Sequence, residues 1–176
     1  MNKVKRGVWI GALVAIGWGG APGISQAVQC QNNLPPSNPN AVYQDHGNGI
    51  VTDTRTGLMW KQCSEGQSWS PGACSGTASG FTWSQSLAWA DAATFAGHAD
   101  WRVPNVKELS SLVEDCRINP AINHALFPNT PSSLFWSASP SAHSSAGAWF
   151  VSFSYGDAYY SHRSNGYHVR LVRGGQ

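Results

Sequence analysis

Four cysteines could carry covalent chemistry in this chain, at positions 30, 63, 74 and 116. An even number of cysteines in an exported chain is typical of disulfides, and four cysteines allow three pairings. We favour a Cys63–Cys74 bond, because it would close a short loop rich in Gly, Ser and Pro. A Cys30–Cys116 bond would then pin an N-terminal arm to the central helix. The alternative is a metal site, but neither a close cysteine pair nor the histidine spacing supports one.

A calcium loop is the second candidate for chemistry. Asp45, Asn48 and Asp53 place oxygen ligands at the short spacing that calcium accepts. The full ligand series and the distal bidentate Glu are missing, and ordinary turn chemistry explains the same residues. We therefore expect no cofactor, with calcium as the alternative at these three residues.

Enzymatic motifs are absent from the sequence after residue 27. It has no Gly-x-Ser-x-Gly elbow, no His-Glu-x-x-His zinc motif and no glycine-rich phosphate loop after a strand. A Ser-His-Asp set could be assembled at will from the many serines, so such a set carries no information. We expect a protein that is not an enzyme.

The charge balance argues against a polyanionic partner. The chain has 11 basic and 9 acidic side chains, and charged residues make up 11% of it. Lys3, Lys5 and Arg6 lie at the N-terminus, which leaves eight basic and nine acidic residues in the remainder. Such a nearly neutral protein gives no reason to expect nucleic acid as a partner.

The N-terminus has the pattern of a signal peptide. A positive start precedes a short apolar run, and Ser25 and Ala27 lie two positions apart, as signal peptidase requires. We assign residues 1–27 to the signal peptide, 28–41 to an N-terminal arm and 42–176 to a single domain. The exported protein is expected at the cell surface, in the periplasm or outside the cell, without membrane insertion after cleavage.

Several strands must position the candidate residues. Ile50–Val51 and Leu58–Trp60 flank a turn and predict a hairpin. Apolar alternation predicts further strands over residues 135–139, 148–153 and 168–173, with a polar connection before the last of them. Together with two helices packed against these antiparallel strands, the pattern predicts an α+β fold stabilised by disulfides.

The two helices are marked by their starts. Thr82 and Asn105 each lie three residues before a Gln or Glu, which is the capping-box pattern. We expect the first helix to end near Gly97 and the second to cover about residues 105–115. Residues 101–103, in which two apolar side chains flank an arginine, predict a short strand that enters the second helix.

A family resemblance rests on motifs that occur in order along the chain: Gly57–Trp60, Asp100–Leu109, Asn119–Ile122, Phe127–Pro128, Phe135–Ser137 and Val169–Arg173. Together these motifs resemble the Lcl C-terminal domain family, named for the Legionella collagen-like protein. The resemblance runs from about Tyr43 to Arg173. It implies a secreted or surface domain related to the C-type lectin-like fold, without catalytic residues. Better-known members are adhesion modules that bind sulfated glycans, and this chain lacks the collagen-like repeat of the namesake.

The C-terminal tail carries a second resemblance, to the variable regions of target proteins of diversity-generating retroelements. In such systems template adenines are copied erroneously, so that Asn codons become codons for Tyr, Ser, Asp, His, Gly, Phe and other residues. The tail residues within that set, which we take as candidate ligand-binding residues, are Phe150, Ser152, Ser154, Tyr155, Asp157, Tyr159, Tyr160, Ser161, His162, Ser164, Asn165, Tyr167 and His168. Trp149, Val151, Phe153, Gly156 and Arg163 interleave with them and would hold the frame. The alternative is an ordinary Ser/Tyr-rich sheet and loop.

The composition of the tail favours binding under either interpretation. Tyr offers a large amphipathic contact area with few rotatable bonds, and Ser, Gly and Asn offer adaptable hydrogen bonds. We expect a secreted or surface receptor or adhesin whose tail binds an unknown protein or cell-surface ligand. The alternative is a fixed domain that binds a sulfated or other glycan, with Trp69 as the best stacking platform unless it covers the core.

Overall fold

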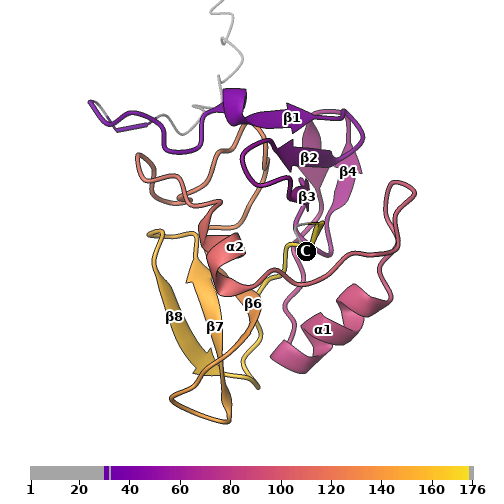
Figure 1. The fold of residues 1–176 in the computed structure, drawn as a ribbon, viewed down its shortest axis with the longest axis vertical. Helices are drawn as coiled ribbons and strands as arrows, with labels where there is room; N and C mark the ends of the chain where they lie inside the picture. Colours follow the sequence, from indigo (N-terminus) through magenta and orange to yellow (C-terminus); the bar gives the residue numbers. More distant parts are fainter. Residues whose placement is uncertain (1–29, 32, 175–176) are drawn as a thin grey trace, which may run out of the picture.

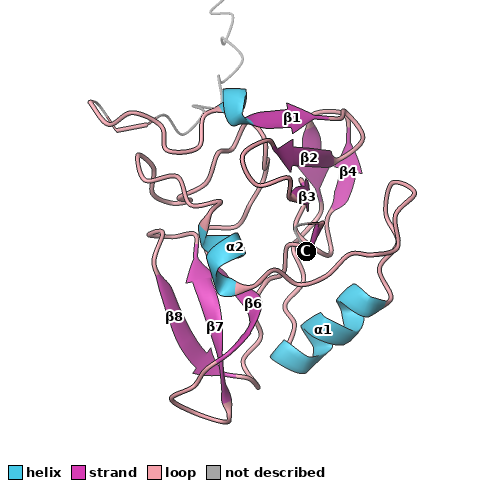
Figure 2. Ribbon diagram, in the orientation of Figure 1, coloured by secondary structure: helices cyan, strands magenta, loops and turns pink. Residues whose placement is uncertain are grey.

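The structure, a computed structural model, describes residues 30–31 and 33–174. The expected signal peptide, residues 1–27, lies outside the described residues. Most of the regular structure consists of short antiparallel strands, joined by two short helices and long loops (Figure 2). This arrangement confirms the α+β prediction. Within the described part of the chain, no helix is long and apolar enough to cross a membrane.

The first sheet has the strand order β1-β2-β3-β9. It contains β1 (Tyr43–Asp45), β2 (Ile50–Asp53), β3 (Met59–Lys61) and β9 (Val172–Arg173). The β2–β3 hairpin confirms the strands expected on either side of the turn at 54–57. The strand expected over 168–173 is shorter than predicted, because only its last two residues pair with β3. Residues 169–171, just before β9, are buried and connect this sheet to the sheet that contains β6 (Leu134–Pro140).

The second large sheet has the order β6-β7-β8 and forms the lower left of the molecule (Figure 1). It contains β6 (Leu134–Pro140), β7 (Gly147–Ser152) and β8 (Ala158–His162), all antiparallel. The first two strands confirm the sequence prediction. The segment from 154 to 168, expected to be a connection, instead contains β8, so the prediction there was wrong.

The Cys63–Cys74 disulfide closes a small hairpin rather than an irregular loop. Strands β4 (Ser68–Ser70) and β5 (Ala73–Ser75) pair in antiparallel register, with Trp69 opposite Cys74. A Cβ atom placed on Gly49 would lie 2.9 Å from Cγ of Trp69, so the indole packs closely on that backbone. Trp69 therefore covers its neighbours and does not stand as an open platform.

Helix α1 (Trp83–Asp91) begins where the sequence predicts and ends earlier. The side chain of Thr82 accepts a hydrogen bond from the backbone of Gln85, whose side chain bonds back to Thr82, so the capping box is confirmed. The helix ends at Asp91, six residues before Gly97. Gly97 and the residue before it both have positive φ and form a tight turn between Phe95 and His98. The glycine thus serves a hairpin-like turn and not a helix end.

Helix α2 (Val106–Ser110) also begins at its predicted cap and is shorter than the expected 105–115. Asn105 and Glu108 form the reciprocal capping box. The helix stops because the chain turns to pair Val113 with Ile122 in an isolated bridge. Backbone pairing with a distant segment therefore replaces the last turn that the apolar stripe predicts.

The core consists of two clusters of buried side chains. One cluster lies beneath α2 and includes Trp60 and Leu109, and the other lies beneath α1 and includes Trp136. Trp101 and Val103 belong to the second cluster, and the arginine between them bridges to β9. Residues 101–103 thus pack on the second cluster, and the strand predicted there is reduced to a single bridge between Arg102 and Val172.

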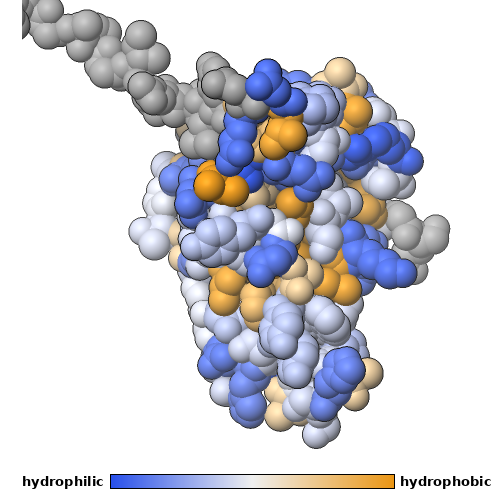
Figure 3. All heavy atoms as spheres, turned by 90° about the vertical axis from the view of Figure 1, so that its left-hand side faces the viewer, coloured by the Kyte–Doolittle hydropathy of each residue, from blue (hydrophilic) through white to orange (hydrophobic). Residues whose placement is uncertain are grey.

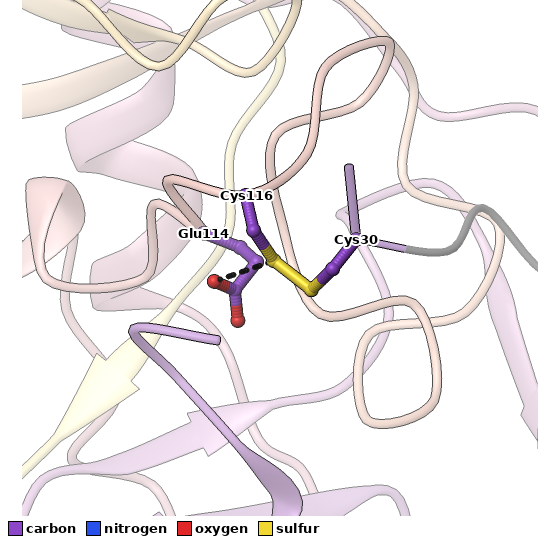
Figure 4. A group of neighbouring side chains, drawn as sticks. All are labelled: Cys30, Glu114 and Cys116. Carbon is purple, nitrogen blue, oxygen red and sulfur yellow. Dashed lines mark hydrogen bonds between the residues drawn. A yellow bond between two sulfur atoms is a disulfide. The ribbon is translucent and has the colours of Figure 1, made fainter. Parts of the chain in front are cut away.

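Both expected disulfides are present, Cys63–Cys74 and Cys30–Cys116. The second bond ties the described part of the N-terminal arm to the segment after α2 (Figure 4). Buried Glu114 lies beside it and accepts hydrogen bonds from the backbone of Ser37 at 2.7 Å and Asn38 at 3.0 Å. The arm is therefore held by a covalent bond and by one buried carboxylate.

Candidate ligand-binding face

Strand β8 presents the centre of the tail at the free edge of the second large sheet. In the register with β7, Tyr160 lies opposite Trp149 and Tyr159 lies opposite Phe150. Because successive residues of a strand point to opposite faces, the two tyrosines start from opposite sides of the sheet. The loops before and after β8 carry the remaining candidate residues. One strand and two loops thus bring the tail residues to one end of the molecule (Figure 1).

Most of the candidate residues reach the surface. Tyr155 is 73% exposed and Tyr159 is 60% exposed, an unusual degree for side chains of this size. The other exposed candidates are Asp157, His162, Ser164 and Asn165. Ser154, Tyr160, Ser161 and His168 are partly exposed. The surface formed by these ten residues is called the tail face below.

An aromatic group dominates the edge of the tail face. The rings of Tyr159 and Tyr160 stack with centroids 5.0 Å apart and planes inclined by only 13°. Because the two side chains start from opposite faces, both rings must lean toward the outer edge of β8. Tyr160 also stacks on His143 at 5.8 Å and meets Trp149 edge-on at 6.0 Å. His143 lies in the β6–β7 loop, and nothing in the local sequence indicated that it joins this group.

A polar network fixes the second half of the tail face. The hydroxyl of Tyr167 donates to Oγ of Ser161 at 2.9 Å, and Nδ2 of Asn165 donates to the same oxygen at 2.8 Å. His162 and Ser164 join through Nδ1 and Oγ at 2.7 Å. These side chains therefore hold one another in place, which lowers the entropy lost when a ligand binds.

Three candidate residues point into the molecule. Ser152 is only 4% exposed, so it cannot reach a ligand in this conformation. Phe150 and Tyr167 are half-buried, and the ring of Tyr167 lies 4.5 Å from Trp136 and 5.3 Å from Phe150. These aromatic side chains pack on the second core cluster and support the tail face from below.

The residues between the candidates anchor the chain. Val151 and Phe153 are fully buried in the first core cluster. Gly156 has φ +89°, and a Cβ atom there would lie 2.7 Å from a methyl group of Val113, so only glycine fits. The Arg163 guanidinium lies 4.2 Å above the Trp83 ring and donates to a β7 carbonyl at 3.0 Å. The exposed tail residues thus alternate with residues fixed in the core or against α1.

The surface of this side of the molecule carries little charge. Seen from the β8 side, its lower half is mostly pale, as expected for Tyr, Ser and Gly (Figure 3). Asp157 is the acidic member of the tail face, and Arg163 is engaged with Trp83. Such a surface suits hydrogen bonding and stacking better than long-range electrostatic attraction.

The residues considered for metal binding are engaged elsewhere. Oδ1 of Asp45 accepts a hydrogen bond from the Gly47 backbone at 2.9 Å, which is an Asx turn. Asp53 is buried and pairs with Arg55 at 2.9 Å. Glu114 lies close to two cysteines in Figure 4, but their sulfur atoms are bonded to each other. Turn formation engages Asp45, an ion pair engages Asp53, and hydrogen bonds from the N-terminal arm engage Glu114.

Comparison with known proteins gives two results. No curated protein shows a significant match to this chain. The sequence pattern of the Lcl C-terminal domain family matches residues 49–173, which include every strand from β2 to β9 and the whole tail face. Such a domain, stabilised by two disulfides, fits an extracellular or surface protein. Because the match covers most of its length, the chain belongs to the Lcl C-terminal domain family.

Proposed function

We propose that this protein is a non-enzymatic receptor or adhesin, exported by its signal peptide, with a C-type lectin-like domain whose tail face binds a protein or another cell-surface ligand. The observation that supports the proposal most strongly is the exposure of Tyr155 and Tyr159 on a buried frame. Exposing two large aromatic side chains is costly unless they are used, and tyrosine is enriched where proteins bind one another.

The frame explains how such a face could bind with affinity. The tail face is held by a strand, an aromatic stack and a hydrogen-bond network, so few side chains need to be ordered on binding. Tyrosine provides contact area, and the neighbouring Ser, Asn and His side chains provide adaptable donors and acceptors. This chemistry suits a protein surface of mixed polarity.

We further propose that the tail is diversified by a retroelement. Among the candidate variable residues, all but Ser152 are exposed or partly exposed, whereas the interleaved Val151 and Phe153 are fully buried. A mutagenic system that changes surface positions and spares core positions would alter the ligand without unfolding the domain. Ser152 is the exception, since a large residue there would have to enter the core.

The gene provides the direct test of diversification. A near-copy of the codons for residues 149–168 should lie in the flanking DNA, beside a reverse transcriptase gene. The two copies should differ only where the template has adenine. If no such copy exists, the tail is fixed, and the diversification proposal fails while the binding proposal stands.

Binding itself is tested with the purified domain. We expect it to stain a subset of cells in a panel, and Tyr155→Ala with Tyr159→Ala to abolish staining. Staining that persists in this double variant would place the binding face elsewhere on the molecule.

A further inference from the structure

Helix α1 carries an exposed tryptophan that the tail face does not use. Trp89 is 50% exposed, and α1 lies on the opposite side of the lower half of the molecule from β8 (Figure 1). The indole therefore presents a large part of its aromatic surface to solvent. None of the tail-face residues lines the surface around it.

The orientation of this indole is fixed by a buried acid. Nε1 of Trp89 donates to Oε2 of Glu65 at 2.8 Å, and the other carboxylate oxygen pairs with Nζ of Lys61 at 2.5 Å. Glu65 is only 5% exposed, so the hydrogen bond is shielded from water. The ring is therefore held rigidly with part of its surface in solvent, which is the arrangement of a preformed binding surface.

Two cavities, both open to solvent, adjoin the indole. The first, of about 570 Å³, is lined by Phe81, Gln85 and small residues of α1 and the preceding loop. The second, of about 440 Å³, is lined by the Lys61–Glu65 pair and by Thr94. Both volumes fall within the roughly 300–1,000 Å³ typical of small-molecule sites. Trp89 and Ala92 line both cavities, and the Phe81 ring lies 5.4 Å from the indole in the first of them.

The chemistry of the two cavities selects a class of ligand. The aromatic walls offer π-faces, and the hydrogens on the apolar face of a pyranose ring carry the partial positive charge that such a face attracts. Gln85 and Thr94 add uncharged hydrogen-bonding groups that match sugar hydroxyls. Of the lining residues, Lys61 and Glu65 carry charge, and they neutralise each other. An anionic ligand gains nothing from such a site.

We infer that Trp89 is the stacking platform of a second site, which binds a neutral oligosaccharide with one sugar unit in each flanking cavity. The site shares no residue with the tail face, so the inference can be wrong while the proposed function is right, and the reverse. It differs from an ionic glycan site in one measurable respect: binding is insensitive to salt, because no net charge is neutralised.

The test follows the indole N–H signals of the protein by two-dimensional NMR. Seven of the nine tryptophans lie after residue 27 and give a tractable set of signals, and Trp89→Phe assigns the one of interest. Cellobiose, mannobiose and chitobiose are added to about 10 mM, which detects millimolar affinity. We expect at least one to shift the Trp89 signal along a saturating curve, unchanged by added NaCl.

Variants separate stacking from a general surface effect. Trp89→Ala should weaken binding of that sugar at least about tenfold, as read from the remaining shifted signals. Trp89→Phe, which keeps an aromatic face, should weaken it less. Ile118→Ala is the matched control, because Ile118 is 47% exposed and does not line either cavity. Its binding should equal that of the unmodified protein.

Three results would overturn the inference. One is that none of the neutral sugars shifts the Trp89 signal. Another is that Trp89→Ala, shown to be folded by its melting curve, binds the sugar with unchanged affinity. The third is that heparin alone shifts the signal and that its effect vanishes with salt, which would identify an ionic site instead.

Discussion

The guanidinium of Arg102 and the carboxylate of Glu108 form two parallel hydrogen bonds, of 2.8 and 2.7 Å. The same carboxylate accepts the backbone N–H of Asn105 at 2.8 Å and so completes the cap of α2. Arg102 also donates to the carbonyl of Gly174 at 2.9 Å, and its backbone bridges to Val172. The Arg102–Glu108 ion pair thus connects the start of α2 with β9 and the residue that follows it.

This pair should make the domain sensitive to acid. Burial raises the pKa of Glu108, but the hydrogen bonds from Arg102 and from the Asn105 backbone outweigh it and hold the pKa below its usual value. A carboxyl group with a lowered folded pKa stabilises the protein above its unfolded pKa, and this contribution is lost as the pH falls through the folded pKa. Glu108→Gln should therefore lower the free energy of unfolding by about 1–2 kcal/mol at neutral pH.

Urea denaturation of the unmodified protein and of Glu108→Gln, from neutral to acidic pH, checks this prediction. The difference between them should begin to shrink below the ordinary glutamate pKa of about 4.3 and vanish as the pH falls through the lowered pKa of Glu108. A difference that stays constant from neutral to acidic pH would mean that the pair contributes through packing alone. Lys107→Gln, on the exposed side of the same helix, is the matched charge-removal control.

The sequence predicted correctly those elements whose formation depends only on neighbouring residues. Both capping boxes, with Thr82 and Asn105 as caps, and the β2–β3 hairpin depend on residues only a few positions apart. The ends of elements depend on distant partners. Helix α2 stops because Val113 pairs with Ile122, and β9 covers only the two residues that pair in register with Met59 and Trp60 of β3. No periodicity within these segments contains that information.

The two disulfides should differ in their contribution to stability. Cys30–Cys116 joins residues 86 positions apart, whereas Cys63–Cys74 joins residues 11 apart. In the chain-entropy model a bond that closes a longer loop restricts the unfolded chain more, by about 4–5 against about 3 kcal/mol here. Replacing Cys30 and Cys116 with serine should therefore lower the free energy of unfolding more than replacing Cys63 and Cys74. Equal losses in urea denaturation would show that loop length does not decide the effect.

Arg170 is a fully buried cation, and among the described residues no carboxylate lies within hydrogen-bond distance of it. Its guanidinium donates to the backbone carbonyls of Lys61 and Gln62 and to Oγ1 of Thr130 at 2.7 Å. Burial lowers its pKa to about 9, and the charge of Glu65 opposes that shift in part. The arginine joins the end of β3 to the loop before β6, so it stabilises the contact between the two large sheets.

Arg170→Lys should show how much this geometry matters. A lysine keeps the positive charge but cannot reach all of these acceptors at once, which leaves buried carbonyls unpaired. We expect the free energy of unfolding to fall by about 1–3 kcal/mol, measured in urea at neutral pH. Arg173→Lys is a suitable control, because Arg173 pairs with exposed Asp100 and should lose far less. If both variants lose the same amount, burial does not decide the cost.

The sequence indicated the tail face through composition, and the structure adds what composition does not contain. The Tyr, Ser and Asn content marked residues 150–168 as a binding segment. It could not show that Ser152 is buried, because burial does not alternate at the end of β7: Val151, Ser152 and Phe153 are all buried, so packing covers both faces of the chain there. It also could not bring in His143, which precedes β7 and reaches Tyr160 through the sheet geometry.

The tail should divide into residues that serve binding and residues that serve stability. Tyr155→Ala and Tyr159→Ala remove exposed rings, so each should change the free energy of unfolding by less than about 0.5 kcal/mol. Tyr167→Ala removes a ring packed on Trp136 and a hydroxyl bonded to Ser161, and should cost about 1–3 kcal/mol. Thermal melts measure the cost, and staining of a recognised cell type measures binding. A large loss of stability in Tyr159→Ala would place that ring in the core and remove it from the ligand face.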